Sequence, residues 1–121
     1  ADALQGVVWS DGELPAADLT LEFAQRLREA APWGQAFPEP QFDGCFVVVD
    51  RRIVGGVHLK LTVQPSAGGP MLDAIWFRAR DPESVRIGDE MRLVYRLDVN
   101  EYRGRRTLQL IVAHLESATG A

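Results

Sequence analysis

The chain has 121 residues, which is enough for one small domain and a short additional segment. Hydrophobic residues make up 46% and charged residues 25%, and no apolar run approaches the roughly 18 residues that a membrane span needs, so we expect no membrane partner. The formal net charge of −4 argues weakly against nucleic acid as a partner. The charge is uneven, however: residues 1–40 hold two basic and seven acidic residues, and residues 41–121 hold eleven basic and ten acidic residues.

The single cysteine, Cys45, excludes a disulfide within the chain and fits a reducing, cytosolic compartment. We interpret it as a small apolar residue that fills a position in a strand, because free cysteine mostly behaves as a hydrophobic side chain. The first residue is not methionine, and we expect the chain to be a fragment of a longer protein.

The N-terminal part predicts a short strand at residues 4–9, a turn at residues 10–12 and a helix at residues 17–31. Leu19, Phe23, Leu27 and Ala30 recur at helical spacing, and Pro32 ends the helix because the residue before a proline avoids helical geometry. We interpret this helix as an ordinary packing helix at the end of a preceding domain. An alternative is an amphipathic surface that binds a partner.

Residues 32–40 contain three prolines, one glycine and two aromatic residues, a composition that no regular element tolerates. They predict an ordered connector in which Trp33 and Phe37 anchor the chain on a neighbouring surface. The expected organisation is therefore an appendage at 1–31, a connector at 32–40, a β domain at 41–116 and a tail at 117–121.

The β domain begins with three predicted strands. The first covers residues 42–52, where Gly44 indicates a bulge or bend, and a turn follows at residues 51–56. In the second, residues 57–63, period-two alternation places Val57, Leu59, Leu61 and Val63 inward and His58, Lys60 and Thr62 outward. The third covers residues 71–79, and the Asp81-Pro82-Glu83-Ser84 sequence after it predicts one helical turn.

The clearest feature of the sequence is a predicted β-hairpin at residues 93–112, and the alternation of its first strand begins at Met91. Met91, Leu93, Tyr95, Leu97 and Val99 share one face of its first strand, and Leu108, Leu110 and Val112 share one face of its second. Gly104 in the link supplies a positive φ, and the tip carries Tyr102, Arg103, Arg105 and Arg106. A basic, aromatic tip suits a partner that is anionic and has flat rings, as single-stranded nucleic acid is.

Five strands with a short helical insertion after the third predict a mainly β fold, a five-stranded Greek-key barrel of the OB type, preceded by the strand-helix appendage. An SH3-like barrel is the alternative. OB folds bind nucleic acid across strands two and three, between the loops that join strands one and two and strands four and five. The candidate binding residues on this surface are Arg51, Arg52, His58, Lys60, Trp76, Arg78, Arg96, Tyr102, Arg103, Arg105 and Arg106. Trp76 is as well suited to the core as to stacking on a base.

Signals for catalysis are weak. His58 and His114 have no second histidine, cysteine or carboxylate at metal-ligand spacing, and no phosphate-binding, dinucleotide-binding or nucleophile-elbow motif occurs. We therefore predict no catalytic residues, no metal ligands and no cofactor in this chain.

The stretches PWGQAFPEPQF (residues 32–42), RRIVGGVHLKL (51–61), LDAIWF (72–77) and RLDVNEYRGRRTLQL (96–110) resemble the C-terminal region of RecJ, the single-strand-specific exonuclease family of the DHH phosphoesterase superfamily. The resemblance implies that residues 1–31 end a DHHA1 domain and that an OB domain follows the connector. It also implies a parent enzyme that degrades single-stranded DNA from the 5′ end in DNA repair and recombination, with Mn²⁺ or Mg²⁺ held by a catalytic domain that this chain lacks.

Two functional hypotheses remain open. The favoured one is a single-stranded DNA-binding OB module in the bacterial cytoplasm, as the resemblance implies. The alternative is a protein-interaction module that docks on its own catalytic domains or on single-strand-binding protein. A free-standing enzyme is a third hypothesis, which the missing metal ligands disfavour.

Overall fold

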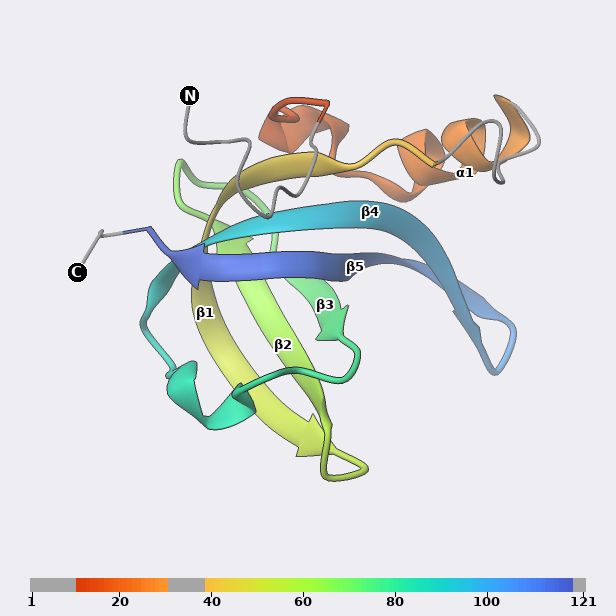
Figure 1. Cartoon of the computed structure of the whole chain (residues 1–121). Coiled ribbons are helices and arrows are strands. Elements are labelled where there is room, and N and C mark those ends of the chain that lie inside the picture. The colour runs from red at the N-terminus through yellow and green to blue at the C-terminus, as the bar shows by residue number, and fades with distance from the viewer. Residues whose placement is uncertain (1–10, 31–38, 119–121) are drawn as a thin grey trace.

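The structure is a computed structural model that describes residues 11–30 and 39–118. Five strands form its body, and Figure 1 shows the tip of the long β4–β5 hairpin extending beyond the other three strands. The strands are β1 (Phe42–Val54), β2 (His58–Pro65), β3 (Leu72–Trp76), β4 (Glu90–Tyr102) and β5 (Arg105–Ser117). The helical elements are η2 (Ala16–Asp18), α1 (Leu21–Ala30) and η3 (Pro82–Ser84), so one helical turn does follow β3 as predicted.

The strands close into a barrel in the order β1-β2-β3-β5-β4. Strand β1 closes it, because residues 42–47 pair with β4 and residues 46–54 pair with β2. Strands β3 and β5 pair in parallel, whereas the other neighbouring strands are antiparallel. The predicted OB-type barrel is therefore confirmed, and the SH3-like alternative is not observed.

Alternating inward residues fill the barrel. Tyr95, Leu93 and Leu110 are at most 1% exposed, as are Leu59 and Val63, so the faces predicted for β2, β4 and β5 are confirmed. Burying each such side chain stabilises the fold by roughly 1.5–3 kcal/mol. Val57 is the exception: it is 48% exposed, and the prediction that it faces inward is wrong.

The cause is the turn between β1 and β2. Gly55 and Gly56 have φ values of 63° and 79°, so the chain reverses there and β2 begins only at His58. Because residues 51–54 continue β1, the turn lies at residues 55–57 rather than 51–56. Arg51 and Arg52 are thus strand residues, which fixes the direction of their side chains.

The predicted bulge lies elsewhere than at Gly44. Residues 42–47 pair with β4 without interruption, and the register shift in β1 falls between Val48 and Asp50, so Val49 is the extra residue. A second shift, between Val94 and Tyr95, leaves Ala113 of β5 unpaired. Bulges increase local twist and so help a five-stranded sheet to close.

Helix α1 packs on the barrel. Thr20 caps its start, since its hydroxyl accepts a hydrogen bond of 3.1 Å from the Phe23 N–H. Leu19 and Ala24 are buried with the barrel core, and Phe23 and Leu27 pack against it. The helix thus starts later than predicted, and its apolar side covers barrel residues. The division into 1–31, 32–40, 41–116 and 117–121 stays a prediction.

The predicted strand at residues 4–9 and the anchors Trp33 and Phe37 lie outside the described residues. Residues 11–13 run beside β1: the Asp43 N–H donates to the Gly12 carbonyl at 3.0 Å, and Glu13 pairs with Asp43 in parallel. None of the helices that the structure describes is long and apolar enough to cross a membrane.

Candidate nucleic-acid interface

The register of the sheet aligns five outward-facing residues across all five strands. Arg52 pairs with Lys60, Lys60 with Ile75, Ile75 with Ile111, and Ile111 with Arg96. Residues directly opposite each other on neighbouring strands project to the same face. These five residues, here called the outer row, form a band with basic ends and an apolar middle.

The charges of the outer row differ in their pairing. Arg96 contacts Glu39 at 3.2 Å between Nη1 and Oε1. Within the described residues, no carboxylate forms an ion pair with Arg52 or Lys60. Two like charges on opposite strand positions repel each other, and a bound anion would relieve that repulsion.

A second row runs parallel to the outer row, two residues along each strand. Its members are Asp50, Thr62, Asp73, Gln109 and Asp98. Three of the five are acidic, so phosphate groups are disfavoured there. The outer row is therefore the positively charged part of the outer face, and the second row is its negatively charged part.

Arg51 does not join the outer row. Its Nη1 donates a hydrogen bond of 2.9 Å to the carbonyl of Pro82 in η3, a residue 31 positions away in the sequence. The same pairing pattern places Arg51 opposite Leu61, which is buried. Arg51 thus holds η3 against β1, and its role as a phosphate contact is less well supported than that of Arg52.

Trp76 ends β3 and Phe77 follows it, and Phe77 rather than Trp76 is the ring that is exposed for stacking. Trp76 shares the face of Leu72 and Ala74 and packs against the core. Phe77 is 51% exposed and lies edge-on to His58, with 5.3 Å between ring centroids. Phe77 was missed as a candidate, although period-two alternation from Leu72 and Ala74 already directs residue 76 inward and residue 77 outward.

Hydrogen bonds fix the backbone beside Phe77. The Arg78 N–H donates to His58 Nδ1 at 3.0 Å, and the Ala79 N–H donates to the Val57 carbonyl at 2.8 Å. Arg78 has a φ of 51°, an unusual value for a residue other than glycine. His58 is therefore a positioning residue for this segment, and the exposed Arg78 side chain lies next to Phe77 in the chain.

The predicted hairpin is confirmed, with a two-residue turn at Arg103 and Gly104. Their φ values are 52° and 76°, and positive φ at both positions is the signature of a type I′ turn. Tyr102 is 65% exposed, and the Arg103 guanidinium lies 5.2 Å from the centroid of its ring. A cation placed over the face of an aromatic ring is stabilised by roughly 0.5–1 kcal/mol at an exposed site.

The register divides the residues of the tip between two faces. Tyr102 pairs with Arg105, and both continue the outward alternation of β4 and β5. Arg106 pairs with Glu101 on the other face. In Figure 1 the tip of the hairpin lies at the right of the view and the β1–β2 turn lies at the bottom. Of the two tip arginines that lie in strand β5, Arg105 is thus on the face of the outer row and Arg106 is on the other face.

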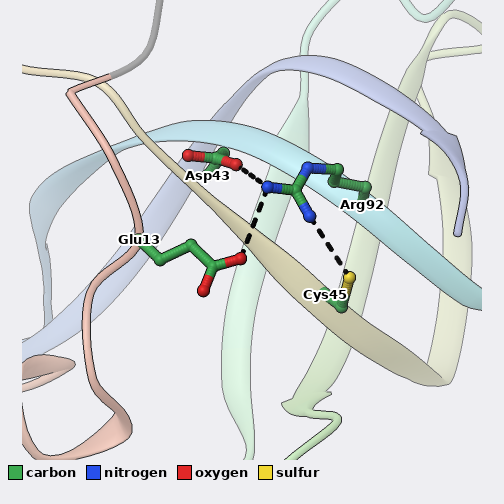
Figure 2. A network of polar contacts seen from close by, with 4 residues as sticks. All are labelled: Glu13, Asp43, Cys45 and Arg92. Atoms are coloured by element: carbon green, nitrogen blue, oxygen red, sulfur yellow. Dashed lines mark hydrogen bonds and ion pairs between the residues drawn. The ribbon is translucent and has the colours of Figure 1, made fainter.

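A separate polar network joins the N-terminal segment to β1 and β4 (Figure 2). Arg92 forms ion pairs with Asp43 and, at 3.3 Å, with Glu13. Its Nη1 also donates to the Cys45 sulfur at 3.6 Å. Burial lowers the pKa of Arg92, but the contacts with Asp43 and Cys45 together outweigh burial and leave this pKa raised. Cys45 occupies a half-buried position in β1, as expected for a residue that fills a place in a strand, and it also has a polar contact with this cation.

Tyr95 is buried next to this network. Burial first, and then the negative charges of Asp43 and Glu13, raise the pKa of Tyr95 well above its ordinary value. Its phenol therefore stays neutral in the folded protein, as a core residue should.

The part of the chain that the structure describes contains no group of three His, Cys, Asp or Glu side chains that would hold a metal ion. These residues do not fit the Mn²⁺ or Mg²⁺ that the sequence resemblance implies for the parent enzyme.

Comparison with known proteins identifies the family. The RecJ OB domain model matches residues 10–114. The chain is 55% identical over 119 residues to the single-stranded-DNA-specific exonuclease RecJ of Dickeya dadantii, a match that covers 95% of this chain and 20% of that protein. The chain therefore spans about one fifth of the length of this relative.

Solved structures show the same fold. RecJ from Thermus thermophilus in complex with Mn²⁺ superposes with a TM-score of 0.70 at 19% identity, covering 92% of this chain and 16% of that chain. A small single-stranded DNA-binding protein from Streptomyces coelicolor has a TM-score of 0.52 at 14% identity, covering 67% and 95% of the two chains. With the family match over most of its length, this chain belongs to the RecJ OB domain family.

Proposed function

We propose that this chain is the single-stranded DNA-binding module of a RecJ-type 5′–3′ exonuclease that acts in DNA repair and recombination. The outer row is the observation that supports it most strongly, because it places Arg52 and Lys60 together without carboxylate partners among the described residues. An OB fold binds single strands by combining such cations with exposed aromatic rings.

Different side chains would contact the phosphate backbone and the bases of the DNA strand. Arg52, Lys60 and Arg105 are outward-facing cations that would contact phosphates. Phe77 and Tyr102 are the exposed rings on which bases would stack, each worth roughly 1–3 kcal/mol per base. Tyr102 and Arg105 extend this surface beyond the barrel and would guide the strand.

Cleavage belongs to another part of the parent protein in this proposal. The described residues offer no metal site, and Mn²⁺ or Mg²⁺ would be bound in a catalytic domain outside the chain. We expect the chain to leave single-stranded DNA intact when it is incubated with Mn²⁺. Degradation by the pure chain would overturn this part of the proposal.

Fluorescence anisotropy with a labelled 12-nucleotide dT strand tests the binding role. The variant R52Q/K60Q removes two outer-row charges, and R26Q/R86Q removes two exposed charges from α1 and from the segment between η3 and β4. We expect the first variant to bind at least several-fold more weakly and the second to bind like the wild type. Equal losses of affinity in both variants would indicate a general effect of charge and no specific role for the outer row.

The same measurement separates the alternative function. A protein-interaction module would bind no oligonucleotide at low salt and would bind its partner with little salt dependence. The candidate partners are the catalytic domains of the parent enzyme and single-strand-binding protein. That pair of results would favour docking over DNA binding.

A further inference from the structure

A hollow in the outer face lies beside the outer row. It is lined by Phe77 after β3, by Arg96 and Asp98 of β4, by Gln109 and Ile111 of β5, and by Glu39. Arg96 and Ile111 are themselves members of the outer row, so a strand that follows this row passes the hollow. Nothing in the sequence pattern indicated that residues from positions 39, 77 and 96–111 meet here.

One wall of the hollow is a flat ring held in place from two sides. Phe77 follows Trp76, which pairs with Leu59 of β2, and the next two residues donate hydrogen bonds to His58 and Val57. The edge contact with His58 restricts the ring further. A ring that is half exposed yet fixed by its neighbours loses little conformational freedom when a ligand stacks on it.

The polar residues of the hollow decide which part of a nucleic acid it suits. Glu39 and Asp98 place two carboxylates there, and each forms an ion pair with an arginine: Glu39 with Arg96 at 3.2 Å, and Asp98 with Arg28 at 3.8 Å. The positive charge beside the hollow is therefore already paired, which disfavours a phosphate group there. A neutral base presents both donors and acceptors along its edge. The carboxylates accept hydrogen bonds, whereas Arg96 and the Gln109 amide donate them, so the hollow matches a base edge better than a phosphate.

We infer that this hollow binds one unstacked nucleobase of the single strand, with Phe77 as the stacking surface and Arg96, Asp98 and Gln109 along the edge of the base. The inference rests on the proposed function, since it assumes that a single strand follows the outer row. It assigns a base site to Phe77, and it separates the base contact in the hollow from the phosphate contacts at Arg52 and Lys60.

The test compares two 12-nucleotide strands, dT and a fully abasic strand with the same phosphates, against the wild type and Phe77→Ala. Loss of one stacked base predicts a fall of about 5- to 150-fold in affinity of Phe77→Ala for dT, which corresponds to about 1–3 kcal/mol. Affinity for the abasic strand should be unchanged. Phe77→Trp keeps a flat ring and should retain affinity for dT.

Ile87→Ala is the control, because Ile87 is 62% exposed and does not line the hollow. It should bind both strands like the wild type. If Phe77→Ala matched the wild type on both strands, or weakened both equally, the base site would be wrong while the proposed function stood. If the wild type bound neither strand at low salt, the proposed function itself would fail.

Discussion

Arg52 of β1 and Lys60 of β2 lie directly opposite each other on the outer face of the barrel, and within residues 11–30 and 39–118 neither forms an ion pair with a carboxylate. A like-charged pair at directly opposite positions of neighbouring strands destabilises a sheet. This repulsion lowers the stability of the barrel at the position where phosphates of the proposed DNA ligand would supply negative charge.

Replacing Lys60 should therefore affect stability and binding in opposite directions. We expect Lys60→Gln to raise the free energy of unfolding by roughly 0.2–1 kcal/mol, because the repulsion from Arg52 is removed. Affinity for single-stranded DNA should fall, with the log–log salt slope less steep by about 0.7 for one lost phosphate contact. Urea unfolding and anisotropy measure the two effects. Lys60→Arg, which keeps the charge, should leave both close to wild type.

The register of the hairpin predicts that its arginines are not equivalent. Arg105 lies beside Tyr102 on the outward face, whereas Arg106 lies beside Glu101 on the other face. Arg105→Ala should therefore weaken binding of a dT strand more than Arg106→Ala does. The two variants change the net charge equally, so each controls for the other. A larger loss for Arg106→Ala would place the strand on the opposite face of the hairpin.

The turn at the tip makes a prediction about stability. Gly104 has a φ of 76°, and a side chain there costs about 1 kcal/mol or more because left-handed geometry is unfavourable for residues other than glycine. Gly104→Ala should lower the urea midpoint accordingly. Gly44→Ala is the matched control: φ at Gly44 is not positive, and the added Cβ meets the Phe46 ring at 3.4 Å. A midpoint that fell as much for Gly44→Ala as for Gly104→Ala would contradict the turn assignment.

The buried phenol of Tyr95 predicts a dependence on alkaline pH. Its folded-state pKa is raised, by burial and by Asp43 and Glu13, above the unfolded value of about 10. The stability that follows is fully present below about pH 10 and is lost as the pH rises from there through the folded-state pKa. Unfolding free energies at about pH 8 and pH 11 should differ less for Tyr95→Phe than for the wild type.

The control for this measurement is Tyr102→Phe, which removes a hydroxyl group from an exposed ring. It should follow the wild type at both pH values. If Tyr95→Phe lost as much stability as the wild type between them, ionisation of the buried phenol would not be part of the alkaline transition.

Local sequence patterns predicted the features of the fold that depend on residues close together in the sequence. Period-two alternation identified the buried faces of β2, β4 and β5, and Gly104 identified the turn between the last two strands. Alternation failed at Val57 because two glycines shifted the turn. Gly44 did not mark the bulge, whose position at Val49 depends on how β1 divides its pairing between β2 and β4.

The candidate site depends on contacts that no local pattern records. Arg51 and Arg52 are adjacent and alike in sequence, but only the structure shows that Arg51 binds the Pro82 carbonyl while Arg52 faces outward beside Lys60. Cys45 meets Arg92 across 47 positions. The outer row itself needs the registers of four strand pairs, and a register is set by the whole sheet.

The salt dependence of binding tests the central claim most directly. Anisotropy titrations of the wild-type chain with a dT strand, repeated over a range of salt concentrations, give the slope of log K against log salt. If Arg52, Lys60 and Arg105 each contact one phosphate, the slope should be about −2, from about −0.7 for each phosphate of a single strand. A slope close to zero, or no binding at the lowest salt concentration, would contradict the account.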